Sequence, residues 1–283
     1  MRFAYRKEFA TEPIADALGR RGWEIVVADH PGELVNQGEA DIALTPALEY
    51  AHAIGVVDYA LVPGLAITTR GFAGLMRLLF NKGLTSFGSM AVKDPAAAEI
   101  AVARIVLSEK HDIDPKIVKV PPDASIADML AVADCALVVG DEAIFAASSH
   151  TSALDLTDEW EDAVEAPLPY MVAWGRVAMV ARGALDDLTS ARDEGVLTLA
   201  DRAALHPQSA QANAFYQRYL RGEIDYTMGE PEYQALDALY RYAFYHLHIP
   251  DIPAIKLLPD GEPATTPTRP DGGGKTPGGP SAR

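Results

Sequence analysis

The sequence contains almost no cysteine. Cys135 is the single cysteine among 283 residues, which excludes an internal disulfide framework and a metal site built from several cysteines. It lies in the apolar segment ADCALVV, residues 133–139, where a free cysteine acts as a small hydrophobic side chain. We therefore expect Cys135 to fill the core rather than to react.

Long apolar runs are also missing. No run approaches the roughly 20 residues that a membrane-spanning helix needs, although hydrophobic residues make up 49% of the chain. The first residues, MRFAYRKEFATEP, include basic side chains but no apolar segment of the kind found in secretory signals. These absences predict a protein that is not inserted in a membrane and is located in the cytoplasm.

Positive charge is scarce. The chain has 24 lysines and arginines against 40 acidic residues, a net charge of −16. This balance argues against nucleic acid or an anionic membrane as partner, because both favour a positive protein surface. It still allows a small anionic ligand, since a few cations can be focused in a cleft. Whether the protein is a monomer or a homodimer stays open.

Familiar catalytic and phosphate-binding motifs are absent too. No glycine-rich loop of the Walker or dinucleotide type occurs, and GGGK at 272–275 lies in a stretch without strand or helix patterning. G-x-S-x-G and H-E-x-x-H do not occur. His246 and His248 are two residues apart on a predicted helix, so they point to different faces. We therefore expect no metal ligands.

The sequence does contain one pattern twice. Residues 40–51 read ADIALTPALEYA and residues 133–146 read ADCALVVGDEAIFA. In each copy an Ala-Asp pair precedes a short apolar run, a break and an Ala-rich stretch with one acid, Glu49 or Glu142. Each copy predicts a buried strand that runs into a turn, and ligands of open α/β sheets bind at such strand ends. The repeat predicts two α/β lobes that face each other across a cleft.

Strands and helices alternate through both halves of the chain. The clearest helix is predicted at 95–113, with Pro95 at its first position and Asp94 as its N-cap. Residues 170–182 predict two further strands, and helices follow from about 183, which return most simply to the first lobe. We expect one lobe from 1–86 plus 175–259, a second from 87–174, and a disordered Pro/Gly/Thr-rich tail at 260–283.

Polar side chains gather at the predicted strand ends. A cation beside a helix N-terminus, as at Lys93, can hold a carboxylate. Each residue also has a plainer role open to it, as a surface charge, a turn former or a helix cap. The candidate set is Arg6, Lys7, Thr11, Thr45, Pro46, Thr69, Arg77, Lys93, Asp94, Gly140 and Asp141.

Several of these segments together match a family pattern. The matching segments are YRKEFATEPI, GEADIALTPALEYA, LVPGLAI, LLFNK, ADCALVVGDEAI, DLTDEW and LPYMVAW, in order across residues 1–250. On this basis the chain resembles the MqnA family of chorismate dehydratases, which serve menaquinone biosynthesis by the futalosine route. The resemblance implies a periplasmic-binding-protein-like fold of type II, with two lobes around a cleft.

The resemblance also implies a reaction. Chorismate, a small anionic substrate, would lose water to give 3-[(1-carboxyvinyl)oxy]benzoate, without a metal or redox cofactor. Under this hypothesis Arg6, Lys93 and the backbone before Pro95 hold carboxylates. Thr11 and Thr45 are polar contacts, and Asp141 or a substrate carboxylate accepts the proton.

The chain departs from the family pattern at polar positions. The asparagine of the first family loop falls on Ala10, and a later Ser/Thr-rich loop is replaced by KDPAAAE, residues 93–99. A family serine near the LLF segment falls on Met76 or Asn81. Charge pairing by Arg6 and Lys93 could replace the lost hydroxyl contacts. Two alternatives remain: a non-catalytic binding protein for a small carboxylate or aromatic acid, and a lyase of the related MqnD type.

Overall fold

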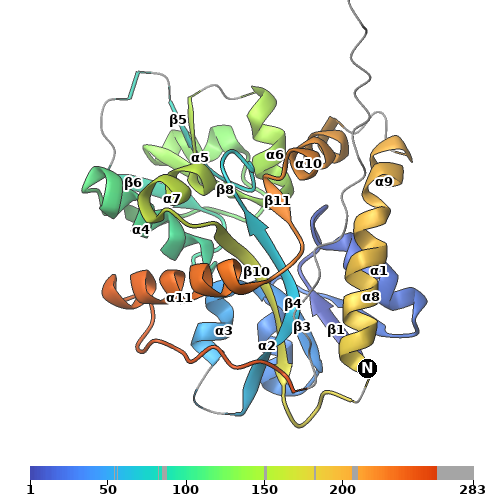
Figure 1. Ribbon diagram of the computed structural model, residues 1–283. Coiled ribbons are helices and arrows are strands. Elements are labelled where there is room, and N and C mark those ends of the chain that lie inside the picture. The colour runs from blue at the N-terminus through green and yellow to red at the C-terminus, as the bar shows by residue number, and fades with distance from the viewer. Residues whose placement is uncertain are drawn as a thin grey trace, which may run out of the picture.

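A computed structural model describes residues 1–53, 55, 57–81, 83–84, 88–149, 152–181, 183–205 and 210–259. The chain forms two β-sheets with helices packed on both, so each sheet is the centre of one lobe (Figure 1). The predicted disordered tail at 260–283 lies outside the described residues.

The sheet of the first lobe has the strand order β11-β4-β10-β3-β1-β2. β1 pairs in parallel with β2 and β3, while β10 runs antiparallel between β3 and β4, and β11 is antiparallel to β4. The strands are β1 Arg2–Tyr5, β2 Glu24–Val27, β3 Ile42–Pro46, β4 Tyr59–Thr69, β10 Leu168–Arg176 and β11 Ile224–Asp225.

The second sheet repeats this plan with the order β7-β6-β8-β5-β9. β6 is parallel to β7 and β8, and β5 runs antiparallel to β8 and β9. The strands are β5 Met76–Phe80, β6 Ser89–Val92, β7 Lys116–Lys119, β8 Cys135–Val139 and β9 Ala153–Asp155. In both sheets the carboxyl ends of the parallel strands therefore emerge at one edge.

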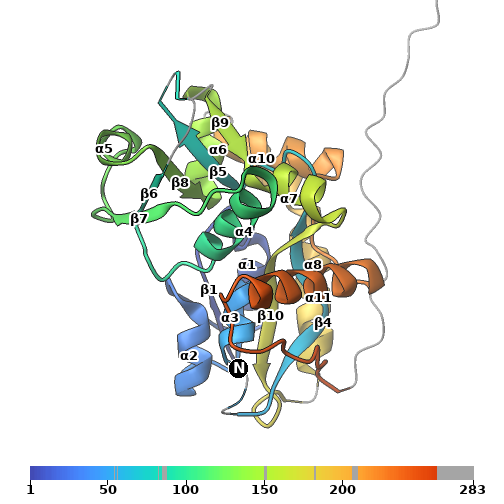
Figure 2. The ribbon, with the colours of Figure 1, turned by 90° about the vertical axis from the view of Figure 1, so that its left-hand side faces the viewer.

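Helices cover both sheets and join the lobes. In the first lobe α8 packs on α1 and β4, and in the second α6 packs on β8. α11 packs on β10 and α3 and also contacts α4 of the second lobe, while α10 contacts α6 (Figure 2). The helices are α1 Glu12–Arg20, α2 Pro31–Gln37, α3 Ala47–Ala53, α4 Glu99–His111, α5 Ile126–Val132, α6 Gly140–Ser149, α7 Leu156–Val164, α8 Ala184–Leu197, α9 Leu199–Leu205, α10 Ala210–Arg221 and α11 Glu230–Tyr245.

Local chemistry explains the element ends. Ser125 closes a capping box with Asp128 at the start of α5. Gly38, at φ +78°, ends α2 in the left-handed region that glycine tolerates best. All of β4 is buried, as expected for a strand with neighbours on both edges and helices on its face. Cys135 is also fully buried, and burial raises the pKa of its thiol to about 12.

Two expectations about single elements differ from the structure. The clearest helix begins at Glu99 rather than at Pro95, and Asp94 accepts a hydrogen bond from Ala96 N (2.9 Å) in the turn before it. Where two strands are expected at 170–182, the described residues up to 181 hold the end of one strand, β10. Segment 155–162 begins at Asp155, the N-cap of α7, and buries Trp160 completely.

The chain also changes sheet at other points than 86 and 174. β5 already belongs to the second sheet, and β10 belongs to the first. Both are apolar strands, and an apolar run carries no information about the sheet in which it pairs. The lobe boundaries therefore depend on pairing partners that are distant in sequence.

Candidate functional site

A cleft of about 640 Å³ lies where the strand ends of the two sheets face each other. Its walls include Arg6 to Glu8 after β1 and His30 after β2 in the first lobe. The second lobe contributes Val92 to Pro95 after β6, Lys119 at the end of β7, and Asp141 at the start of α6. The sequence-based expectation of a cleft between strand ends is confirmed.

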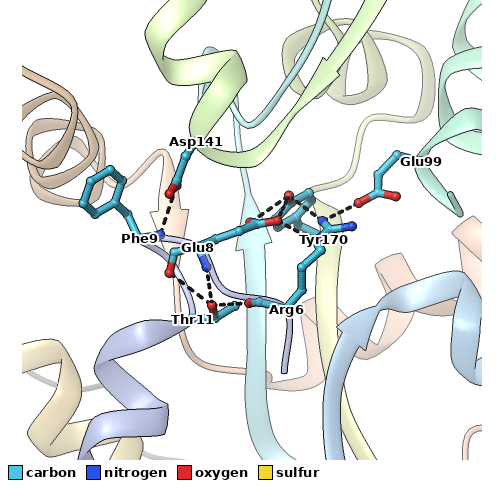
Figure 3. A network of polar contacts seen from close by, with 7 residues as sticks. All are labelled: Arg6, Glu8, Phe9, Thr11, Glu99, Asp141 and Tyr170. Carbon is cyan, nitrogen blue, oxygen red and sulfur yellow. Dashed lines mark hydrogen bonds and ion pairs between the residues drawn. The ribbon is translucent and has the colours of Figure 1, made fainter. Parts of the chain in front are cut away.

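Arg6 is the centre of a polar network that joins the lobes (Figure 3). Its Nε donates to Glu8 Oε1 (2.6 Å), and its Nη2 donates to Glu99 Oε1 (2.5 Å) and to the hydroxyl oxygen of Tyr170 (3.0 Å). The Tyr170 hydroxyl in turn lies 3.0 Å from Glu8 Oε2. Because Glu99 starts α4 in the second lobe, the Arg6–Glu99 ion pair spans the two lobes.

The network is almost dry. The side chains of Glu8, Glu99 and Arg6 are 7%, 3% and 18% exposed. Burial, with the nearby charge of Glu99, raises the pKa of Glu8 despite the contact with Arg6. Burial and the neighbouring Glu8 also raise the pKa of Tyr170 far above its ordinary value, so its hydroxyl stays a neutral donor.

Asp141 projects from the second lobe toward the loop after β1. Its Oδ1 accepts a hydrogen bond from the backbone N–H of Phe9 (3.0 Å). Burial raises the pKa of Asp141 to about 6, and Glu8 contributes in the same direction. A carboxylate with a pKa just below neutrality is suited to proton transfer at pH 7.

The remaining cations of the cleft differ in how they are paired. Lys93 Nζ lies 2.7 Å from Glu142 Oε1, and Lys7 Nζ lies 3.3 Å from Glu12 Oε1. Lys119 is exposed and forms no ion pair with the described part of the chain. His30 and Asp94 face each other across the lobes at 3.0 Å.

Five predicted site residues line this cleft: Arg6, Lys7, Lys93, Asp94 and Asp141. Gly140, beside Asp141, contributes by its lack of a side chain. Its φ is +60°, and a Cβ there would stand 2.8 Å from the carboxyl carbon of Glu8. The glycine therefore lets the two lobes meet closely at this point.

Thr11, Thr45 and Thr69 are buried and do not line the cleft. Thr11 donates to Arg6 O (2.6 Å) and accepts from Glu8 N (3.0 Å), so it shapes the loop that carries both. Thr45 accepts from Trp174 Nε1 (2.8 Å), and Thr69 donates to Leu168 O (3.4 Å). Their hydroxyls are hydrogen-bonded within the fold and do not face a ligand in the cleft.

Pro46 and Arg77 also lie elsewhere. Pro46 borders a separate cavity of about 10 Å³ beside Glu99. Arg77, in β5, faces Asp155 at 3.5 Å within the second lobe. Neither residue lines the larger cleft.

Glu8, Glu99, Tyr170 and Lys119 are cleft or network residues that the sequence did not single out. Lys119 could have been recognised in the sequence, because it ends the short apolar segment KIVK, residues 116–119. In the structure it ends β7, and its register partner is Val92, next to Lys93. Glu99 was hidden by the predicted helix start at Pro95, which placed it further along the helix. Nothing in the local pattern marked Glu8 or Tyr170 as partners of Arg6.

No group of three or more metal-binding side chains occurs within the described ranges. A helix long and apolar enough to cross a membrane is likewise absent from the described part of the chain.

The fold places the protein among structures with the periplasmic-binding-protein architecture. The crystal structure of protein AF1704 from Archaeoglobus fulgidus is 19% identical at a TM-score of 0.67, over 88% of this chain and 98% of that one. The periplasmic aliphatic sulphonate binding protein SsuA of Escherichia coli is 14% identical at a TM-score of 0.64, over 90% and 95%. SsuA from Xanthomonas axonopodis pv. citri bound to MOPS is 16% identical at a TM-score of 0.64, over 91% and 96%.

Residues 9–245 match the model of one protein family, VitK2_biosynth, described as menaquinone biosynthesis. The chain belongs to this family, which confirms the resemblance found in its motifs. A search of curated proteins found no match.

Proposed function

We propose that this protein is a lyase that removes water from chorismate to give 3-[(1-carboxyvinyl)oxy]benzoate. The proposal is carried by Asp141, a carboxylate with a raised pKa on the wall of a cleft that also holds lysines. Membership in a menaquinone-biosynthesis family supports the substrate class.

The reaction requires the protein mainly to position chorismate and to transfer protons. A ring proton and the neighbouring hydroxyl leave together as water, and the ring becomes aromatic. Asp141 is the proton acceptor, because it lines the cleft and its pKa of about 6 keeps it mostly ionised at pH 7. Its hydrogen bond from Phe9 N fixes the direction of the carboxylate.

The lysines are the groups that hold the substrate carboxylates. Lys119 and Lys93 lie at neighbouring strand ends of the second lobe, and Lys7 lies on the opposite wall. A substrate carboxylate would displace Glu142 from Lys93, an exchange of one partly exposed ion pair for another. Arg6 has no such role, since Glu8, Glu99 and Tyr170 already occupy its guanidinium.

Incubation of the purified protein with chorismate tests the proposal. We expect loss of chorismate and appearance of an aromatic product of the mass of 3-[(1-carboxyvinyl)oxy]benzoate. Asp141→Asn should lower kcat by at least about 100-fold. Asp112→Asn is the matched control, because Asp112 caps α4 away from the cleft, and asparagine also tolerates its φ of +55°. Full activity of Asp141→Asn would exclude Asp141 as the base.

A second candidate is a binding protein for a small carboxylate. It is favoured by the ion pairs of Arg6 and Lys93, which leave fewer cations for a dianion than the sequence suggests. Tight binding of chorismate in calorimetry without product, in the same preparation, would select this function.

A further inference from the structure

Two buried carboxyl groups share one guanidinium in this protein. Arg6 contacts Glu8 on one side and Glu99 on the other, at 2.6 and 2.5 Å. If both carboxyls were ionised, the three side chains would carry a net negative charge in a nearly dry place. Such a charge is costly, and a carboxyl takes up a proton instead.

The contacts indicate which carboxyl holds that proton. A neutral carboxyl has one O–H donor, which needs an acceptor. Glu99 Oε2 is buried and has no hydrogen-bond partner among the described residues, so a proton there would lack an acceptor. Glu8 lines the cleft, where an oxygen atom of a ligand can accept.

Glu8 also lies beside Asp141, which belongs to the opposite lobe. Phe9, the residue after Glu8, donates its backbone N–H to Asp141, and the absent side chain of Gly140 leaves room for the Glu8 carboxyl. Figure 3 shows Asp141 reaching the backbone of Phe9 from the second lobe, while the Glu8 carboxyl points toward Tyr170 and Arg6. The cleft thus holds two neighbouring acids in different environments. Such a difference moves the pKa values of the two groups apart, so that one can act as the acid and the other as the base.

We propose that Glu8 is the general acid of the cleft, working beside Asp141 as the base, and that Glu99 is a positioning residue that keeps Glu8 protonated by sharing Arg6. The catalytic part of this inference rests on the proposed function. Asp141 takes the ring proton, the carbon–oxygen bond breaks, and the Glu8 proton joins the leaving hydroxyl oxygen to form water. Exchange with solvent then returns a proton from Asp141 to Glu8, so protons and charges balance over one turnover.

Kinetics of two variants test the roles. Glu8→Gln should lower kcat by at least about 100-fold, because the amide cannot supply the proton. In Glu99→Gln, Glu8 is the only one of the two carboxyls left beside Arg6, and this stabilises the ionised form of Glu8. The alkaline limb of the pH–rate profile should therefore move down by about one pH unit or more. Glu109→Gln, on the outer part of α4, is the control. A Glu99→Gln enzyme with lower kcat but an unmoved profile would overturn the positioning role.

Infrared spectra of the ligand-free protein at pH 7 test the proton itself. We expect the carbonyl stretch of a protonated carboxylic acid that both Glu8→Gln and Glu99→Gln abolish, since either change leaves one carboxylate with one guanidinium. The spectra are recorded in the Glu49→Gln background, because the pKa of Glu49 is about 7 and its own protonated carboxyl would otherwise contribute a band at pH 7. A Glu49→Gln protein without the band would overturn the inference, and this result does not depend on how well the Glu8 and Glu99 variants fold.

The two experiments separate the inference from the proposed function. Turnover of chorismate without the band would keep the dehydratase and remove Glu8 as its acid. The band without turnover would keep the proton on Glu8, beside the Arg6 that it shares with Glu99, and remove the dehydration, and with it the catalytic role.

Discussion

In the first lobe β3 runs directly into α3, and in the second lobe β8 runs directly into α6, and both segments share the pattern Ala-Asp-x-Ala-Leu. The first junction is closed: Thr45 is fully buried, Leu48 is 1% exposed, and Tyr240 of α11 donates to Ala47 O (3.2 Å). The second junction is open to the cleft at Asp141. A repeated strand–turn–helix segment therefore gives a core in one lobe and a site in the other, according to what packs over its end.

The two units are aligned residue by residue when 93 is added to the first numbering. Asp41 corresponds to Asp134, Leu48 to Asp141, and Glu49 to Glu142. The first pair keeps one role in both lobes. Asp41 accepts from Arg2 N at the start of β1, and Asp134 accepts from Ser89 N at the start of β6. The later pairs differ, because the lobes surround them differently.

Exchanging the residues at 48 and 141 should give the largest difference in unfolding free energy between the two junctions. Leu48→Asp places a carboxylate in the closed junction without a partner and should cost about 4 kcal/mol or more of unfolding free energy. Asp141→Leu should cost about 1 kcal/mol or less, because it removes a half-buried carboxyl and one backbone contact. Urea unfolding of both variants measures the difference, and similar losses in both would show that the two junctions are equally closed.

Glu49 and Glu142 should differ in their effect on stability against pH. Burial raises the pKa of Glu49 from 4.5 to about 7, with Glu99 adding to the rise. The folded protein thus holds the Glu49 proton more tightly than the unfolded chain, and this contribution disappears as the carboxyl ionises. The unfolding free energy should fall by about 3 kcal/mol between pH 4.5 and pH 7 on account of Glu49.

Glu49→Gln tests this expectation. The variant should lose that part of the pH dependence in urea unfolding at several pH values. Glu142→Gln is the matched control, because the Glu142 side chain is 36% exposed and has Lys93 as partner. A Glu49→Gln protein with the wild-type pH dependence would contradict the assignment.

Thr45 and Val138 occupy corresponding positions on the two strands. Thr45→Val removes the acceptor of Trp174 Nε1 and leaves a buried donor unpaired, which should cost about 2 kcal/mol. The second lobe already has valine there, buried at 1% exposure. Val138→Ile is the control for a change in strand packing without a polar group, and thermal unfolding compares the two. An unchanged Tm in Thr45→Val would mean that Trp174 finds another acceptor.

Asp41 and Asp134 should give the smallest difference. Asp134 Oδ2 accepts from Gly88 N, Ser89 N and the Ser89 hydroxyl, whereas Asp41 accepts from Arg2 N. The Ser89 hydrogen bond lowers the pKa of Asp134, so its stabilising contribution is present above that group's ordinary value and is lost as the pH falls. Asp134→Asn should therefore lower Tm more than Asp41→Asn at pH 7, and the reverse order would contradict this.

The sequence predicted the strand ends well, because the end of a strand follows from the local pattern of apolar residues. Arg6, Lys7, Lys93, Asp94 and Asp141 all line the cleft. What the sequence could not show is a distant partner that already binds the polar group. Thr45 is bound by Trp174, which is 129 residues away, and Arg6 by Glu99, which is 93 residues away.

The sequence by itself determined the family, the alternation of strands and helices, and the two facing units, since these follow from local residue patterns. Only the tertiary structure decided which strands cross between the lobes, which junction is closed by α11, and that Arg6 is shared by two glutamates. Sheet pairing and burial depend on residues far apart in the chain, and the protonation of a carboxyl depends on the charges and water around it. Those surroundings exist only once both lobes have folded and met.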